Sequence, residues 1–189
     1  MKLVKYLTFL LGLVSLIGFV VYYEAGLGGF YAFVNIPGIV LLVIGTTLAT
    51  LMTFTVSEIF LSFKCALFNN KKWSKEQLVC ARQMFSGLCN TSVAFGCIGT
   101  IISLIMILRT IEDAAVVPKR LALALSTLFF GLFISEIVFA PLKRNVEKYY
   151  SVLGISESSN RIRILLVALC VFVLISALFA ILYAMNAHI

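Results

Sequence analysis

The sequence predicts an all-α protein that crosses a membrane several times, and two observations carry this prediction. Of the 189 residues, 62% are hydrophobic and only 12% are charged, whereas soluble domains average about 45–50% apolar and about 25% charged residues. The apolar residues also gather in five stretches, each close to the roughly 20 residues that a helix needs to cross a bilayer. This composition argues against a soluble enzyme, a disordered chain and a disulfide scaffold.

The five expected spans make up a single membrane domain over residues 1–189. They fall at residues of about 3–22, 36–58, 91–108, 121–140 and 164–185. In the first, Lys2 and Lys5 precede an apolar core, so this span could be mistaken for a signal peptide. Its exit, VYYEAG, lacks small residues at both cleavage positions, so we interpret it as a retained span.

The basic residues predict how the spans are oriented. The N-terminal tail and the segments 64–82 and 143–163 carry twelve of the fifteen Lys and Arg residues. Basic segments stay in the cytoplasm, so the N-terminus is expected inside and, after five spans, the C-terminus outside. The net charge of +7 is thereby explained by orientation. It gives no sign of a nucleic-acid partner, because the basic residues are not interleaved with aromatic ones.

Small and hydroxylated residues recur on one face of the third and of the fourth span. Their spacing of three or four residues is that of a helix face, and it allows either close helix packing, which spacing alone favours, or a pore lining. The residues are Ser92, Gly96, Thr100 and Ser103 in the third span and Ala124, Thr127, Gly131 and Ser135 in the fourth.

Ionisable groups inside a membrane are candidates for function. Glu136 is such a group, because it lies within the fourth expected span. It lies fifteen residues after Leu121, about 22 Å along a helix, and so near the inner face. There it is either an interfacial acid paired with Lys143 or Arg144, or part of an ion path or a partner contact. No acid lies at the centre of any span, so an ion-carrying carboxylate would have to come from another subunit.

Nothing in the sequence suggests catalysis or a cofactor. The five cysteines form no CxxC pair and no Cys/His ligand pattern, and the only histidine is His188. No nucleophile and base are spaced as a catalytic set, and no glycine loop could hold a phosphate. We therefore expect neither an enzyme nor a metal site.

Three stretches, in order, resemble the MotA/TolQ/ExbB family of proton-channel subunits, and most closely its MotA branch. IPGIVLLVIGTTLATLMTFTVSEIFLSFK is similar to the second span of that branch, AFGCIGTIISLIMILRTIED to the third, and LALALSTLFFGLFISEIVFAPLK to the fourth. The matching residues are Pro37, Gly45, Thr47, Phe54, Ser57 and Glu58, then Gly96, Gly99, Thr100, Glu112 and Asp113, and then Thr127, Gly131 and Pro141.

The sequence also departs from the family pattern. A short linker replaces the large cytoplasmic domain between the second and third spans, and a fifth span is added. Single positions differ as well. Where the family has glycine, this chain has Thr46 and Ser103, and where the family has proline it has Val93. A threonine of the family is replaced by Leu128, with Ser126 close by, and an asparagine by Glu136.

The resemblance implies an architecture and a set of roles. Five subunits would surround two copies of a single-span partner, similar to MotB, TolR or ExbD, whose membrane aspartate carries the ion. Thr100 and Thr127 would face that aspartate, and Pro141 would shape the inner end of the fourth span. Gly96, Gly99 and Gly131 would allow close approach, and Ser103 and Ser126 would lie on the same pore face.

The expected function is that of an ion-driven motor or energy-transducing channel subunit of the bacterial inner membrane, with the proton favoured over sodium as the ion. The missing cytoplasmic domain argues against a flagellar stator. The alternative is a non-conducting membrane scaffold that keeps the fold, which the missing domain, Val93 and Leu128 favour. A secondary transporter ranks third, because the sequence shows no inverted repeat.

Overall fold

The computed structural model describes residues 2–33, 35–68, 73–109 and 117–151, and the single positions 168, 172 and 175. Throughout these residues the regular structure is helical. The elements are α1 (Lys2–Phe33), α2 (Ile36–Thr53), α3 (Val56–Leu67), α4 (Lys75–Leu108), α5 (Val117–Phe133), the π-helix η1 (Ile134–Phe139) and α6 (Ala140–Ser151). Because α5, η1 and α6 follow one another without a gap, they form one long helical path.

Among the described residues, four helical stretches are long and apolar enough to cross a membrane. They are Tyr6–Tyr23, Ile36–Thr53, Lys75–Ile107 and Arg120–Tyr149. The chain is thus a polytopic helical membrane protein, as the composition predicted. The fifth expected span, 164–185, lies outside the described residues except for positions 168, 172 and 175.

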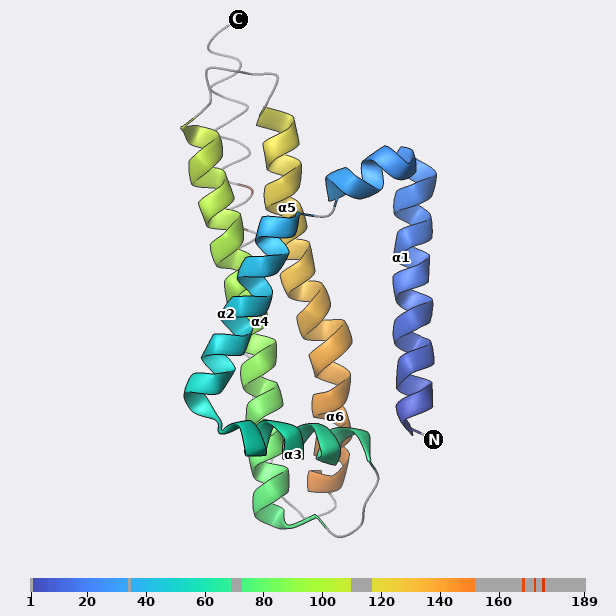
Figure 1. Cartoon of the computed structure of the whole chain (residues 1–189), viewed down its shortest axis with the longest axis vertical. Coiled ribbons are helices and arrows are strands. Elements are labelled where there is room, and N and C mark those ends of the chain that lie inside the picture. The colour runs from blue at the N-terminus through green and yellow to red at the C-terminus, as the bar shows by residue number, and fades with distance from the viewer. Residues whose placement is uncertain are drawn as a thin grey trace, which may run out of the picture.

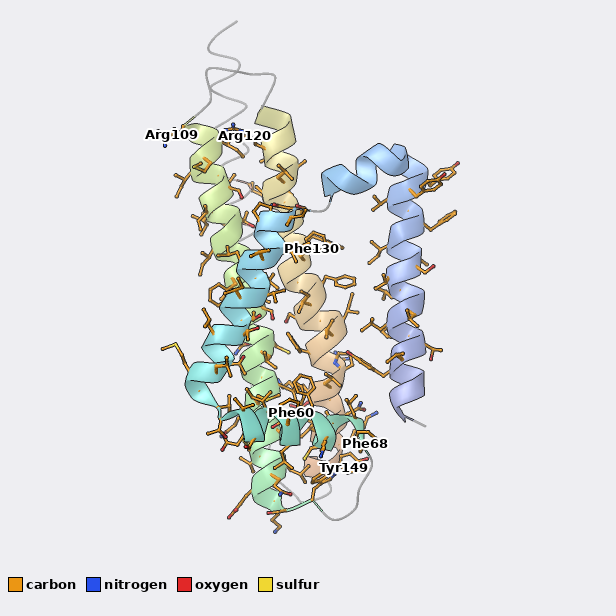
Figure 2. The ribbon with its side chains drawn as sticks, viewed as in Figure 1. Phe60, Phe68, Arg109, Arg120, Phe130 and Tyr149 are labelled. Atoms are coloured by element: carbon orange, nitrogen blue, oxygen red, sulfur yellow. The ribbon has the colours of Figure 1, made fainter. Side chains whose placement is uncertain are left out.

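The spanning helices run up and down in chain order, and α3 lies across them (Figure 1). The start of α1, the whole of α3 and the end of α6 lie at one end of the molecule, which we call the α3 end. Arg109 and Arg120 mark the opposite end (Figure 2). The described parts of the basic segments that the sequence assigned to one side of the membrane therefore share one end of the fold.

The second span ends earlier than predicted, at Thr53 instead of residue 58. Phe54 is extended, with φ −129° and ψ 144°, and Thr55 then caps a new helix, α3. The Thr55 N–H donates to Glu58 Oε2 over 2.8 Å, and the Glu58 N–H donates to Thr55 Oγ1 over 3.4 Å. This reciprocal pair is a capping box, which satisfies N–H groups that an exposed helix start would leave open.

Glu58 is thus a capping residue of α3 and not the inner end of the second span. The hydrogen bond from the Thr55 backbone, followed by that from the Thr55 side chain, lowers the pKa of its carboxyl group. A lowered pKa means that the folded chain favours the ionised carboxylate. The capping contribution is therefore present at neutral pH and is lost as the pH falls through the folded-state pKa.

The helix of the third span is longer than hydropathy predicted, since it begins at Lys75 instead of residue 91. Ser74 and Gln77 form a second capping box there. The first helix also continues beyond residue 22, to Phe33, with a non-helical residue at Gly26 (φ 62°, ψ −166°). A positive φ of this size is one that glycine adopts without the steric cost of a side chain, so the helix changes direction there.

A hydrophobic core at the α3 end holds α3 against α4 and α6. Its fully buried members include Cys65 of α3, Met84 and Phe85 of α4 and Val146 of α6. An ion pair joins the other two helices, since Arg82 Nε of α4 is 3.4 Å from Glu147 Oε1 of α6, and Lys143 Nζ, also of α6, is 3.8 Å from the same oxygen. Apolar packing thus holds α3, and the ion pair adds to the contact of α4 with α6.

Burial in this core should make Cys65 unreactive. Its side chain is 0% exposed, and burial, with a smaller effect from nearby Cys80, raises the pKa of the thiol to about 11. Because only the thiolate reacts, we expect no N-ethylmaleimide adduct on Cys65 at pH 7.5 in mild detergent. Mass spectrometry of tryptic peptides measures this, with the SDS-denatured chain as the labelled control. Equal labelling of the two samples would contradict the packing of α3.

Candidate functional site

The helices α4 and α5 touch backbone to backbone at Gly96 and Gly131. A Cβ atom placed on Gly131 would lie 2.8 Å from Gly96 Cα and 2.9 Å from the Ser92 carbonyl oxygen, and one on Gly96 would lie 3.0 Å from Gly131 Cα. Carbon atoms that are not bonded pack at about 3.5–4.0 Å. The contact therefore has no room for a side chain on Gly131.

Toward the opposite end, two threonine hydroxyl groups lie inside the same contact. Thr100 Oγ1 is 2.9 Å from the Gly96 carbonyl oxygen of its own helix and 3.1 Å from the Ala124 carbonyl oxygen of α5, and can donate to either. Thr127 Oγ1 donates to the Leu123 carbonyl oxygen over 3.1 Å. Each threonine is 1% exposed, so both protons are held by main-chain acceptors within the chain.

Asn35 joins α2 to this pair of helices. Its Nδ2 donates to Thr127 Oγ1 over 2.8 Å and to the Leu123 carbonyl oxygen over 3.0 Å. Its Oδ1 accepts the Gly38 N–H over 3.2 Å and so caps α2. One buried amide therefore starts a span and fixes it to α5.

Asn35 was not among the residues predicted from the sequence, although a signal was present. Asn35 directly precedes Ile36 and Pro37, and an asparagine just before a proline in the first helical turn is typical of a helix start. A Cβ on Gly38 would lie 2.6 Å from Thr127 Oγ1. Gly38 thus gives α5 the room to approach, a role that composition does not reveal.

At the level of η1, α4 and the long helix are joined by a second reciprocal pair. Ser135 Oγ donates to the Cys89 carbonyl oxygen over 2.9 Å, and Cys89 Sγ donates to the Ser135 carbonyl oxygen over 3.6 Å. Ser135 and Ser92 are both 0% exposed. The small-residue faces of the third and fourth spans thus pack on each other over several turns.

Five of the predicted pore-face residues meet in this contact: Gly96, Gly99, Thr100, Thr127 and Gly131. Ser103 and Ser126 differ, because their hydroxyl groups donate within their own helices, to Gly99 and to Leu123. Ser103 is half-buried, and Ser126 is buried. The arrangement within one chain is close packing, whereas a pore lining concerns an assembled complex and stays a prediction.

Pro141 follows directly on η1 and accounts for its geometry. Proline has no N–H, and inside an α-helix its ring would collide with the carbonyl group four residues back, here that of Ile137. The helix instead widens, and the Ala140 N–H donates to Ser135, five residues back. Tyr6 of α1 donates its hydroxyl proton to the Val138 carbonyl oxygen over 2.8 Å, so the widened turn also fixes α1.

Glu136 lies in η1 and its side chain is exposed. Lys143 forms a salt bridge with Glu147, four residues further on. The pairing of Glu136 with Lys143 or Arg144 that the sequence suggested stays a prediction, as does a role of this acid in an ion path or a partner contact.

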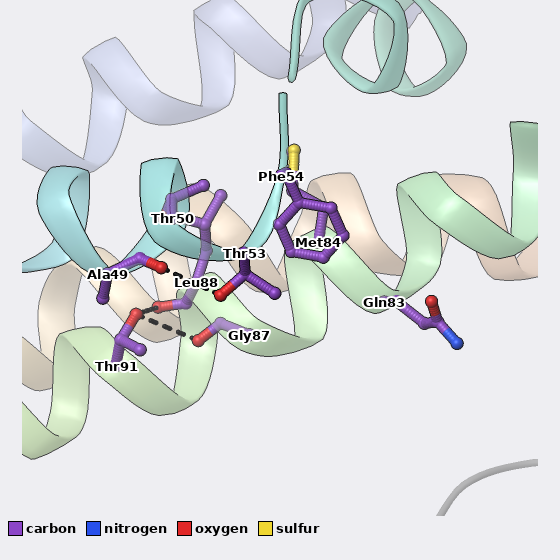
Figure 3. Close-up of a pocket in the computed structure, with 9 residues that line it drawn as sticks. All are labelled: Ala49, Thr50, Thr53, Phe54, Gln83, Met84, Gly87, Leu88 and Thr91. Carbon is purple, nitrogen blue, oxygen red and sulfur yellow. Dashed lines mark hydrogen bonds between the residues drawn. The ribbon is translucent and has the colours of Figure 1, made fainter. Parts of the chain in front are cut away.

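A cavity of about 310 Å³ lies between α2 and α4 near the α3 end (Figure 3). Its hydroxyl groups are engaged with their own helices: Thr53 donates to Ala49 over 3.0 Å and Thr91 to Gly87 over 3.0 Å. The lining residues are Ala49, Thr50, Thr53, Phe54, Gln83, Met84, Gly87, Leu88 and Thr91. Since none of them is acidic or basic, the cavity does not offer a charge to an ion.

Among the described residues, no group of three His, Cys, Asp or Glu side chains could hold a metal ion. The candidate site is instead a contact between two membrane helices, built from glycine and hydroxyl groups. Together with the fold, it defines the class: a multi-span membrane protein whose helices α4 and α5 pack through glycine and hydroxyl groups.

The comparison with known proteins identifies the family. The MotA/TolQ/ExbB proton channel family matches residues 45–153, which is more than half of the chain. The chain therefore belongs to that family, and the resemblance seen in the sequence is confirmed. The matched region includes all of α4 and α5, and so the whole Gly96–Gly131 contact.

Two curated relatives match shorter stretches. The chain is 31% identical over 65 residues to Motility protein A of Borreliella burgdorferi, which is 34% of this chain and 25% of that protein. It is 28% identical over 67 residues to the uncharacterized protein YtxD of Bacillus subtilis, which is 35% of this chain and 25% of that protein. The aligned part thus spans about a quarter of the length of each relative.

Proposed function

We propose that the chain is the multi-span subunit of a proton-driven motor or energy-transducing channel in the bacterial inner membrane. It forms a homopentamer around two copies of a single-span protein that is similar to MotB, TolR or ExbD. The aspartate of that protein carries the ion. Thr100 and Thr127 lie beside the ion path, and the α3 end faces the cytoplasm because the basic residues gather there.

The observation that carries this proposal is the lack of charged residues in the stretches where α4 and α5 pack on each other. Residues 84–108 and 121–135 contain no Asp, Glu, Lys, Arg or His. A proton channel subunit with no acid in these stretches needs a carboxylate from elsewhere. A single-span partner supplies one at the membrane depth where this chain offers hydroxyl groups.

The proposal predicts that valine at Thr100 or Thr127 will reduce proton flux about tenfold or more, a barrier increase of about 1.4 kcal/mol. Valine keeps the shape of threonine and removes only the hydroxyl group. In Thr127→Val, Asn35 still donates to the Leu123 carbonyl oxygen, so the fold should remain. Flux is measured with a pH-sensitive dye in proteoliposomes that contain the chain and its single-span partner.

Thr47→Val is the matched control, because Thr47 is an exposed hydroxyl of α2 that donates to Val43 in its own helix. It should conduct as the unchanged chain does. Native mass spectrometry of each variant tests the assembly, with five copies and two partner copies expected. Unchanged proton flux in both Thr100→Val and Thr127→Val would contradict the proposed position of the two threonines beside the ion path.

A non-conducting scaffold is the second candidate, and the burial of the two threonines favours it. Each is 1% exposed, with its proton on a main-chain acceptor, as in a purely structural contact. A five-subunit ring that binds its partner but passes no protons would establish this function.

A further inference from the structure

The helix α3 has two unlike sides. One side packs into the core through residues such as Ser62, Cys65 and Ala66. On the other side, Phe60 is 68% exposed, Val56 is 57% exposed, and Phe68, which directly follows the helix, is 56% exposed. Figure 2 shows Phe60 and Phe68 at this level of the molecule. Large apolar groups gathered on a surface indicate a partner.

The lengths of the helices place α3 at the boundary of the hydrocarbon layer. The 18 residues of α2 cover about 27 Å, close to the roughly 30 Å of a bilayer core. Along α4, the stretch from Phe85, in the core beneath α3, to Arg109 at the opposite end covers about 36 Å. This length is slightly more than the thickness of the hydrocarbon layer, so α3 and Arg109 lie near its two boundaries. Arg82 and Glu147, which are ion-paired, lie at the same level as α3.

The apolar side of α3 continues a surface that already faces lipid. The last turn of α2 exposes Leu51 and Met52, the latter by 90%. One turn after Phe60, the exposed Lys64 adds a positive charge to the same side of α3. Lysine extends its charged end to the headgroups while its carbon chain stays among apolar groups.

We propose that α3 is an interfacial helix that inserts Val56, Phe60 and Phe68 into the adjacent leaflet, at the boundary between acyl chains and headgroups. Lys64 contacts anionic lipid headgroups, which are enriched on the cytoplasmic side of membranes. This lipid contact stabilises the orientation of α3, which lies across α2 and α4. It also holds the hydrophobic core of the α3 end at the membrane surface. It is independent of whether the chain conducts protons.

The test measures the depth of residue 60 in lipid vesicles. Trp73 is the only tryptophan of the chain, so Phe60→Trp is made in a Trp73→Phe background and reconstituted in phosphatidylcholine and phosphatidylglycerol vesicles. Lipids brominated near the headgroup or near the chain end quench the fluorescence according to depth. Lys75→Trp, at the exposed start of α4, serves as the water-facing control. Ile98→Trp serves as the deep control, because Ile98 is 45% exposed and lies midway along α4 between Phe85 and Arg109.

We expect Phe60→Trp to be quenched most by shallow bromines, with emission shifted to the blue of Lys75→Trp, and Ile98→Trp to be quenched most by deep ones. In pure phosphatidylcholine, Lys64→Gln should leave the quenching unchanged, whereas adding phosphatidylglycerol should increase it only when Lys64 is present. Val56→Trp repeats the test if Phe60→Trp does not fold.

Two results would overturn the proposal. Quenching of residue 60 by aqueous iodide but not by brominated lipid would mean that α3 faces water. Protection from both quenchers, together with disulfide cross-linking between chains in Phe60→Cys, would mean that a second copy covers α3.

Discussion

Replacing Gly131 with alanine is expected to lower the free energy of unfolding by about 2 kcal/mol, because overpacking of a tight core typically costs about 1–3 kcal/mol. The added Cβ would lie 2.8 Å from Gly96 Cα and 2.9 Å from the Ser92 carbonyl oxygen. Both are main-chain atoms, so a rotamer change in a neighbour cannot relieve the clash. The helices α4 and α5 must move apart, which also lengthens the Thr100 hydrogen bond to Ala124.

The sign of the change makes this a sharp test. By helix propensity alone, alanine would stabilise an interior helical position by about 1 kcal/mol relative to glycine. Gly12 of α1 has no atom within 4 Å of its added Cβ, so Gly12→Ala should be neutral or stabilising. Unfolding by SDS in detergent micelles, followed by circular dichroism, compares the two. A stabilised Gly131→Ala chain would show that the helices do not meet at this residue.

The sequence predicted the elements that depend on repeating patterns. Hydropathy located the four spans that the structure describes, because lipid exposure requires long apolar runs. The spacing of Gly96, Thr100, Thr127 and Gly131 predicted small-residue faces on the third and fourth spans, and these faces do meet. Such periodic features are recoverable because every turn of a helix repeats the same requirement.

Features that depend on single contacts were not predicted. Hydropathy does not change at Phe54, so the second span was extended to Glu58, although Thr55 and Glu58 form the Ser/Thr-x-x-Glu pattern of a capping box. The widened turn at η1 needs Pro141 and also the contacts of Ser135 and Tyr6 with other helices. Those contacts bring together residues 46 and 132 positions apart in the sequence, where local patterns carry no information.

Asn35→Ala is expected to lower the free energy of unfolding by about 3 kcal/mol, and it tests the contact that the sequence analysis missed. About 1 kcal/mol follows from losing the N-cap of α2. A further 1–3 kcal/mol or so follows from leaving buried polar groups without their partner, because Asn35 is 8% exposed and joins Thr127 and the Leu123 carbonyl oxygen. The same SDS titration measures the loss.

Matched variants separate the two contributions. Asn35→Ser keeps an oxygen that can cap Gly38 but has no amide to reach α5, so it should be more stable than Asn35→Ala by about 1 kcal/mol. In a double-mutant cycle, Asn35→Ala and Thr127→Val should be coupled by at least about 0.5 kcal/mol, as is typical of residues in direct contact. Strict additivity would mean that the amide acts only as a cap. Coupling would instead mean that Asn35 at the start of α2 and the hydroxyl group of Thr127 stabilise each other. A partner that binds the Thr127 hydroxyl group would then also change the stability of the second span.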